Sequence, residues 1–200
     1  MKQWILMAAA LAGSAAMAQN KAELDAVQRA VHVCAACHGE AGRSTNPLVP
    51  SLAGQMREYT IRQLKDFRSQ SRAETDIQAY MWGVSALLTD DQIEGLADHY
   101  AAQTPAAAKS TNPKLEAAGK KLFDDGLPAK GVRPCAACHG TNAEGAAGFP
   151  RLAGLNAKYV VRQLTAFRTP LRPHGVVMKQ EIQALSDAQM KAVTAYVASR

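Results

Sequence analysis

Two short segments of this 200-residue chain place cysteine and histidine side chains at one fixed spacing. The sequence Cys-Ala-Ala-Cys-His-Gly occupies residues 34–39 and returns unchanged at residues 135–140. Cysteine supplies a nucleophilic thiolate or a metal ligand, and histidine supplies an imidazole that binds transition metals. All four cysteines of the chain lie in these two copies, so none remains to form an unrelated disulfide.

The spacing of these residues favours one chemistry, the covalent attachment of haem c. Two thiols three positions apart can add to the two vinyl groups on one edge of a porphyrin, which places the next residue's imidazole beneath the iron. A zinc site would leave both histidines unexplained, and a redox-active dithiol needs neither the histidine nor a second copy. We therefore predict two haem c groups. The predicted thioether residues are Cys34, Cys37, Cys135 and Cys138, and the predicted proximal ligands are His38 and His139.

A second axial ligand should recur in both copies at a matched position. Each copy contains a helix-capping box, which starts at Thr89 in the first copy and at Ser186 in the second. Met81 lies eight residues before the first box, and Met178 lies eight residues before the second. The other candidates do not recur: Met56 aligns with asparagine and His174 with isoleucine, for example. Met81 and Met178 are therefore the predicted distal ligands.

His/Met ligation would have a functional consequence. The soft thioether favours ferrous iron and raises the reduction potential relative to ligation by two histidines. Because protein side chains would fill both axial positions, no coordination site would remain open for a substrate. The expected role is one-electron transfer, with no catalytic residues, and a dihaem peroxidase is disfavoured.

The rest of the sequence is duplicated around these ligands. Residues 50–68 and 150–168 share ten identities in nineteen positions, and the periodicity of apolar residues predicts helices throughout both copies. The expected middle helices are 57–68 and 157–168, and a loop over residues 124–134 should separate the first helix of the second copy from its motif. We predict an all-α fold with domains over residues 19–102 and 114–200, joined by a linker over residues 103–113.

The amino terminus and the charge distribution suggest where the protein acts. Residues 1–18 carry one early lysine, an apolar run and a small-residue ending, which predicts a cleaved signal peptide and export to a periplasm. No later segment is apolar for long enough to span a membrane. Residues 19–105 carry a net charge of −3 and residues 106–200 a net charge of +8. Such an uneven charge distribution can orient a protein toward its partners. An ordinary solvated surface whose charges differ between the halves by chance explains the numbers equally well.

The chain resembles the class I c-type cytochromes, and within them the dihaem cytochrome c4 family. The motifs that carry the resemblance are C-x-x-C-H-G, P-x-L-A-G, Y-x-x-R-Q-L-x-x-F-R, the late methionine and L-[ST]-D, each present twice. The resemblance implies two monohaem domains related by pseudo-twofold symmetry, with haem propionates near their interface. It also implies that the carbonyls of Pro50 and Pro150 accept hydrogen bonds from the proximal histidines.

The resemblance suggests propionate-binding residues and one departure from the family pattern. Expected propionate contacts are Tyr59, Arg62 and Gln63 with their counterparts Tyr159, Arg162 and Gln163, although these could equally be ordinary helix-surface residues. Gly119 and Phe123 match the spacing at which class I cytochromes pack their first and last helices together. Val27 and Val31 stand at the equivalent place in the first copy, so packing there is expected to differ.

The expected function is a periplasmic shuttle that carries electrons from a quinol-oxidising bc-type complex to a terminal oxidase. The alternative is an electron-transfer subunit of a dehydrogenase, such as a sulfide-oxidising flavocytochrome. Redox proteins are the expected partners and nucleic acid is not, while peripheral membrane association stays open. Potentials, the direction of electron flow and oligomeric state cannot be obtained from the sequence.

Overall fold

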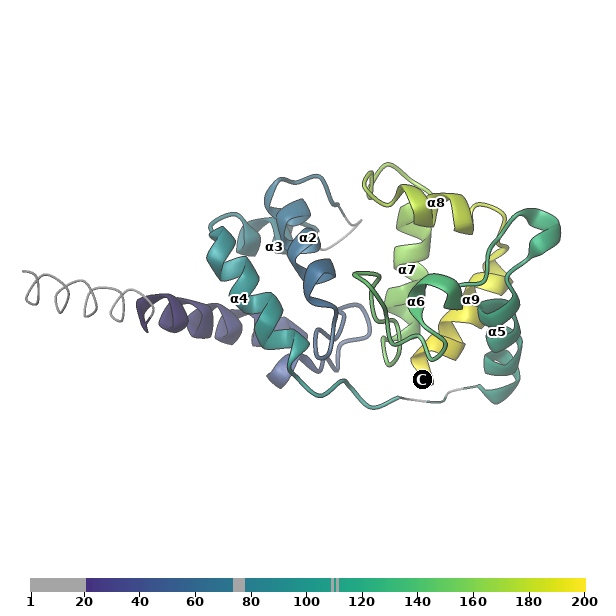
Figure 1. The fold of residues 1–200 in the computed structure, drawn as a ribbon, viewed down its shortest axis with the longest axis horizontal. Coiled ribbons are helices and arrows are strands. Elements are labelled where there is room, and N and C mark those ends of the chain that lie inside the picture. The colour runs from purple at the N-terminus through teal and green to yellow at the C-terminus, as the bar shows by residue number, and fades with distance from the viewer. Residues whose placement is uncertain (1–20, 74–77, 109, 111) are drawn as a thin grey trace, which may run out of the picture.

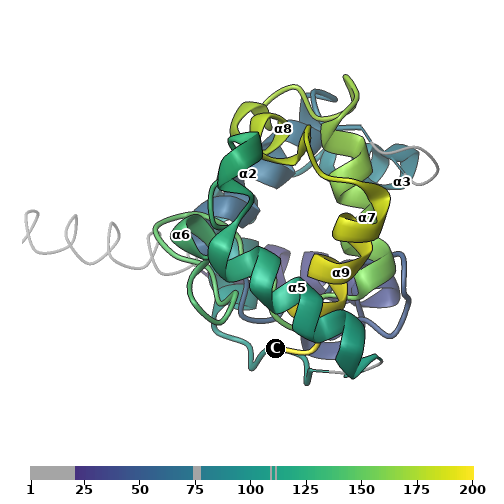
Figure 2. The ribbon, with the colours of Figure 1, turned by 90° about the vertical axis from the view of Figure 1, so that its right-hand side faces the viewer.

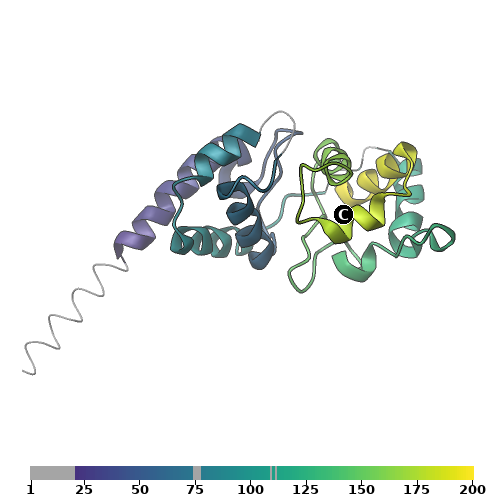
Figure 3. The same ribbon diagram turned by 90° about the horizontal axis from the view of Figure 1, so that it is seen from above.

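The chain folds into two helical lobes that lie side by side along its long axis (Figures 1 and 3). The structure, a computed structural model, describes residues 21–73, 78–108, 110 and 112–200. The expected signal peptide over residues 1–18 lies outside these residues. Within the described residues, pairing between extended segments is limited to two isolated bridges, Leu127 with Val132 and Ala146 with Phe149. The predicted all-α fold is confirmed.

In the described part of the first lobe, the chain forms four helices and one helical turn. Residues 21–38 are helical, so the helix runs without a break into and through the first cysteine motif. The 3-10 turn η1 follows at Glu40–Gly42, and the remaining helices are α2 (Arg57–Arg68), α3 (Gln78–Ser85) and α4 (Asp90–Ala101). Helix α2 packs against both α3 and α4. The expected helix over residues 57–68 is confirmed.

The second lobe repeats this order with one added loop. Its elements are α5 (Pro113–Asp125), η2 (Pro128–Lys130), α6 (Ala136–His139), α7 (Ala157–Phe167), α8 (Val176–Ile182) and α9 (Asp187–Ala198). Asn112 caps α5 by accepting a hydrogen bond from the Leu115 amide, and Pro113 occupies the first turn, where a missing amide proton costs least. Helix α5 ends before the cysteine motif, and η2 lies in the loop that follows it, as the sequence predicted.

Both predicted capping boxes are present. The hydroxyl of Thr89 accepts a hydrogen bond from the Gln92 amide, and the Gln92 side chain accepts one from the Thr89 amide. Ser186 and Gln189 make the same reciprocal pair at the start of α9. Because such a box fixes where a helix begins, the last helix of each lobe starts at a matched position. The methionine eight residues upstream is therefore held at a matched position too.

The first and last helices of each lobe cross closely, but a glycine on a different helix permits the crossing in each. In the second lobe, where α5 crosses α9 (Figure 2), a Cβ on Gly119 would overlap the backbone carbonyl of Ala192. In the first lobe the glycine lies on the last helix, where a Cβ on Gly95 would meet the Val27 side chain. The packing differs between the lobes, as expected, because the glycine lies on the first helix of the second lobe and on the last helix of the first lobe.

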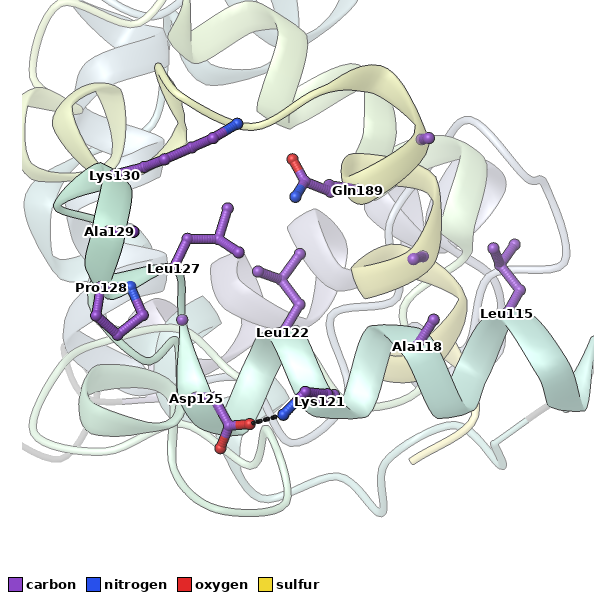
Figure 4. A pocket seen from close by; sticks show the side chains of 13 residues that line it. Leu115, Ala118, Lys121, Leu122, Asp125, Leu127, Pro128, Ala129, Lys130 and Gln189 are labelled. Carbon is purple, nitrogen blue, oxygen red and sulfur yellow. Dashed lines mark hydrogen bonds and ion pairs between the residues drawn. The ribbon is translucent and has the colours of Figure 1, made fainter.

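A groove borders the added loop of the second lobe (Figure 4). Its volume is about 690 Å³, and its walls come from α5, the segment over residues 126–130 and the start of α9. Leucine, alanine and proline side chains line most of it, with Lys121, Asp125, Lys130 and Gln189 among the polar residues. None of the cysteines, histidines or methionines predicted to hold haem lines this groove.

The helix crossing in the second lobe predicts the effect of one added methyl group. Gly119→Ala should lower the free energy of unfolding by at least ~2 kcal/mol, because the new Cβ meets backbone that cannot rotate away. Gly83→Ala is the matched control, since no atom lies within 4 Å of its Cβ position and alanine favours a helix. Denaturant unfolding of the haem-loaded protein measures both. Equal stability of the two variants would contradict the close crossing.

Candidate haem-binding sites

Each motif histidine is the last residue of a helical segment, and its ring is fixed by one hydrogen bond. His38 and His139 are 8% and 5% exposed. Their Nδ1 atoms donate to the carbonyl oxygens of Pro50 and Pro150, at 2.8 Å and 3.0 Å. Since Nδ1 carries the proton, Nε2 keeps a lone pair for a metal. The two prolines therefore stand where the resemblance to the c-type cytochromes placed them.

The glycine after each histidine turns the chain away from the helix. Gly39 and Gly140 have φ angles of 79° and 81°, a region that glycine enters without steric cost.

Burial lowers the pKa of the His139 imidazole, although the hydrogen bond to the Pro150 carbonyl opposes this effect. The ring is therefore neutral at pH 7, which is the state that binds iron.

The four cysteines form no disulfide with one another and lie in two separate lobes. Burial raises the pKa of the Cys135 thiol to about 11 and also raises that of Cys34. These thiols would be protonated at neutral pH, so their surroundings suit an uncharged thioether. Among the described residues, no group of three or more His, Cys, Asp or Glu side chains could hold a metal ion. The zinc alternative thus lacks a ligand cluster in the part of the chain that the structure covers.

The two candidate distal ligands lie on equivalent short helices. Met81 is in α3 and Met178 is in α8, and both side chains are half-buried. Met178 packs against the apolar core of the second lobe. Both methionines therefore lie at equivalent, half-buried positions and remain the candidates for the distal ligand.

Two arginines that the sequence reasoning missed hold the segment after each methionine helix. Arg68 donates through Nη1 to the carbonyl of Leu88, at 2.7 Å. Arg168 donates to the carbonyl of Ile182, at 3.0 Å, and to that of Leu185, the counterpart of Leu88. Both arginines end the repeated Y-x-x-R-Q-L-x-x-F-R segment, and their identity in the two copies was the available signal.

The two lobes meet through hydrogen bonds between residues about one hundred positions apart. The Gln55 side chain bonds both the amide and the carbonyl of Arg151, at 2.8 Å and 3.0 Å. Arg62 donates to the carbonyl of Gly148 at 2.6 Å. The Ala73 amide donates to the Leu171 carbonyl at 2.7 Å. Residues from equivalent segments of both copies thus form the interface.

The expected propionate-binding residues divide into two groups. Tyr59 and Tyr159 face the interface, and each hydroxyl accepts a hydrogen bond from an arginine of the other lobe, at 3.4 Å and 3.3 Å. Arg62 is used to bridge the lobes, and Arg162 is half-buried on α7. The structure therefore brings the tyrosines together with polar side chains between the lobes.

No helix among the described residues is both long and apolar enough to cross a bilayer.

Two helical lobes, each with a Cys-x-x-Cys-His motif, a carbonyl-anchored histidine and a downstream methionine, define a tandem c-type cytochrome. The Cytochrome c family model matches residues 24–101 and 116–200. A crystal structure of cytochrome c4 from Pseudomonas stutzeri matches with a TM-score of 0.79 at 32% identity, covering 88% of this chain and 97% of that one. The chain belongs to the dihaem cytochrome c4 family.

Two further relatives show the range of this similarity. Cytochrome c-552 of Acidithiobacillus ferridurans is 39% identical over 191 residues, which cover 94% of this chain and 83% of that protein. A thiosulfate dehydrogenase electron acceptor of Thiomonas intermedia is 33% identical over 175 residues, which cover 84% and 78%. The chain binds two haem c groups and carries electrons. Haem iron supplies a one-electron couple, and the residues above would hold and orient it.

The ligand assignment predicts the spectra of two variants. Met81→Ala and Met178→Ala should each convert one of the two haems from low spin to high spin and lower its reduction potential, because a thioether ligand is lost. Met56→Leu, which aligns with Asn156 in the other copy, should leave both haems low spin. Absorbance and electron paramagnetic resonance of the ferric proteins report the change. Retention of two low-spin haems in both alanine variants would refute these methionines as ligands.

Proposed function

We propose that this cytochrome is exported, that cleavage follows Ala18, and that it shuttles electrons in a periplasm from a quinol-oxidising bc-type complex to a terminal oxidase. Domains over residues 19–102 and 114–200, with a linker over residues 103–113, would each carry one haem. His38 with Met81 and His139 with Met178 would be the axial pairs. The observation that carries this proposal is the repetition of the anchored histidine and the downstream methionine in both lobes.

Exposed apolar side chains near both methionines support a role in transient docking. In the first lobe, Tyr80, Val84 and Leu87 are 72%, 46% and 91% exposed. In the second, Val176 and Val177 flank Met178 on its amino-terminal side and are also exposed. Apolar residues gathered at a surface mark sites of protein contact, and small contacts permit rapid release. Partners would therefore bind beside the methionine helix of each lobe.

A second candidate function is service to one dedicated dehydrogenase. The thiosulfate dehydrogenase electron acceptor matches 84% of this chain at 33% identity, which favours such a partner over the sulfide-oxidising flavocytochrome that the sequence suggested. The two functions differ in whether the cytochrome leaves its donor after reduction. A shuttle dissociates, whereas a subunit stays bound.

Purification of the native protein from periplasm separates these functions. A shuttle should elute alone at moderate salt, and the reduced protein should be reoxidised by membranes that contain a terminal oxidase. Inhibition of the bc-type complex should block its reduction by quinol. A stable complex with a dehydrogenase, together with no oxidation by membranes, would reject the shuttle and favour the dehydrogenase partner.

The charge asymmetry predicts that the two half-reactions use different lobes. Lys158→Glu in the basic lobe and Asp91→Lys in the acidic lobe alter exposed charges without touching the haem ligands. Each should slow one half-reaction by roughly threefold to tenfold at low ionic strength and leave the other unchanged, because steering acts at the surface that docks. Stopped-flow measurement of reduction and oxidation over a salt series tests this. Equal effects of both variants on both half-reactions would refute separate docking.

A further inference from the structure

One ion pair in the second lobe joins the segment that leads into the cysteine motif to the helix that carries the candidate distal ligand. Arg133 lies two residues before Cys135, and Glu181 lies one helical turn after Met178 on α8. Arg133 Nε donates to Glu181 Oε1 at 2.6 Å, and Arg133 Nη2 lies 2.5 Å from the same oxygen. The Arg133 backbone amide donates to Oε2 at 2.9 Å. One residue therefore engages both carboxylate oxygens of Glu181.

The surroundings of this pair distinguish it from an ordinary surface contact. The Glu181 side chain is only 20% exposed, although that of Arg133 is 63% exposed. Burial would raise the pKa of the Glu181 carboxyl group, but hydrogen bonds from the Arg133 side chain and amide outweigh it and lower the pKa. Glu181 is also close enough to Cys135 for its charge to raise the pKa of that thiol, after the larger effect of burial. The pair therefore lies beside a cysteine that would join the porphyrin.

The added loop of the second lobe makes this contact possible. An amide inside a helix donates to the carbonyl four residues before it and is not available to a side chain. Arg133 lies between α5 and α6, outside any helix, so its amide can donate to Glu181. When the cysteine motifs are aligned, His32 takes this position in the first copy, inside the helix over residues 21–38. The first lobe thus lacks the free donor.

The first lobe also lacks the acceptor. When the capping boxes are aligned, Val84 stands in place of Glu181. Helix α3 contains no charged side chain, so it cannot form an ion pair with its own motif. It is held from another direction, because Trp82 Nε1 donates to the Arg72 carbonyl at 2.8 Å, and Lys179 replaces this tryptophan in the second copy. The two methionine helices are therefore fastened by different side chains to different parts of their lobes.

We propose that Arg133 and Glu181 are positioning residues for Met178, which hold its helix against the cysteine motif and slow the replacement of Met178 by another ligand. This inference rests on the assignment of Met178 as a distal ligand in the function proposed above. Met178 and Glu181 are neighbours on one face of α8, because they are three positions apart. Movement of α8 away from the motif would stretch every contact between Arg133 and Glu181. Ligation in the second lobe should therefore depend on this pair, and ligation in the first lobe should not.

Binding of imidazole to the ferric, haem-loaded protein measures this dependence. Imidazole replaces the methionine without a change in oxidation state: the iron–sulfur bond breaks and an iron–nitrogen bond forms. Stopped-flow absorbance should show one phase for each haem. Met178→Ala identifies the phase of the second haem, because an open site should bind imidazole much faster than a site from which a ligand must first leave.

Loss of either partner should have the same effect on that phase. Glu181→Gln and Arg133→Gln should each accelerate it by about threefold to tenfold, because a charge-assisted contact is lost. The double variant should be no faster than the faster single variant, since both remove one shared contact. Arg133→Lys keeps the charge and should restore part of the parent rate. Asp125→Asn, which breaks an exposed ion pair with Lys121 on α5, is the matched control and should change neither phase.

The direction of the changes separates positioning from a direct effect of charge on the iron. Such an effect would have opposite signs in Glu181→Gln and Arg133→Gln, because the two substitutions remove opposite charges. Opposite changes, no change in either variant, or equal acceleration of both phases would overturn the proposal. If Met178→Ala left both phases as in the parent, the ligand assignment itself would fail, and this inference with it. Failure of the pair variants alone would leave the ligand assignment and the carrier function intact.

Discussion

The iron of a His/Met haem needs ligands on opposite faces, and this requirement organises each lobe. The cysteine motif fixes one face by joining the porphyrin edge and the histidine to five consecutive residues. A ligand for the other face would come from about forty residues later, where Met81 and Met178 are the candidates. Everything between these points has to hold two short helical segments at a set separation.

Four kinds of contact would hold that separation. The carbonyls of Pro50 and Pro150 fix the histidine rings. Arg68 and Arg168 fasten the turn that follows each methionine helix, and the capping boxes begin the last helix directly after that turn. The last helix then crosses the first one closely, and in the first lobe that first helix also carries the cysteines. Because each contact appears twice, loss of one should disturb mainly its own lobe.

The interface has a different character from the lobe cores. Long side chains from α2, α7 and the segments after them reach across it, and the buried centre consists of arginine, glutamine and tyrosine. At the edge, the His174 ring and the Asp66 carboxylate pair at 2.9 Å across the lobes. A polar centre with directional hydrogen bonds specifies one relative orientation of the lobes more strictly than apolar contact would. That orientation matters if electrons pass between the two haems.

Local patterns in the sequence predicted most of the fold. The capping boxes, the helix over residues 57–68 and the loop after α5 each depend on neighbours within a few positions, so duplication and periodicity were enough to find them. The burial of Arg72 and Arg172 between the lobes was not predicted. An arginine on a polar segment normally faces water, and here only the contact between the lobes buries the two side chains. The sequence showed only that the first helix of the first lobe lacks a counterpart of Gly119, and not that Gly95 on the last helix takes over its role.

Proton nuclear magnetic resonance of the ferrous protein tests the central claim most directly. The ring current of a porphyrin shifts the methyl group of an axial methionine far upfield, away from all other methyl signals. Selective labelling of methionine methyl groups should give two such resonances, one of which disappears in each of Met81→Ala and Met178→Ala. Two upfield resonances assigned to these residues would establish the same ligation in both lobes. A single resonance, or none, would contradict the account.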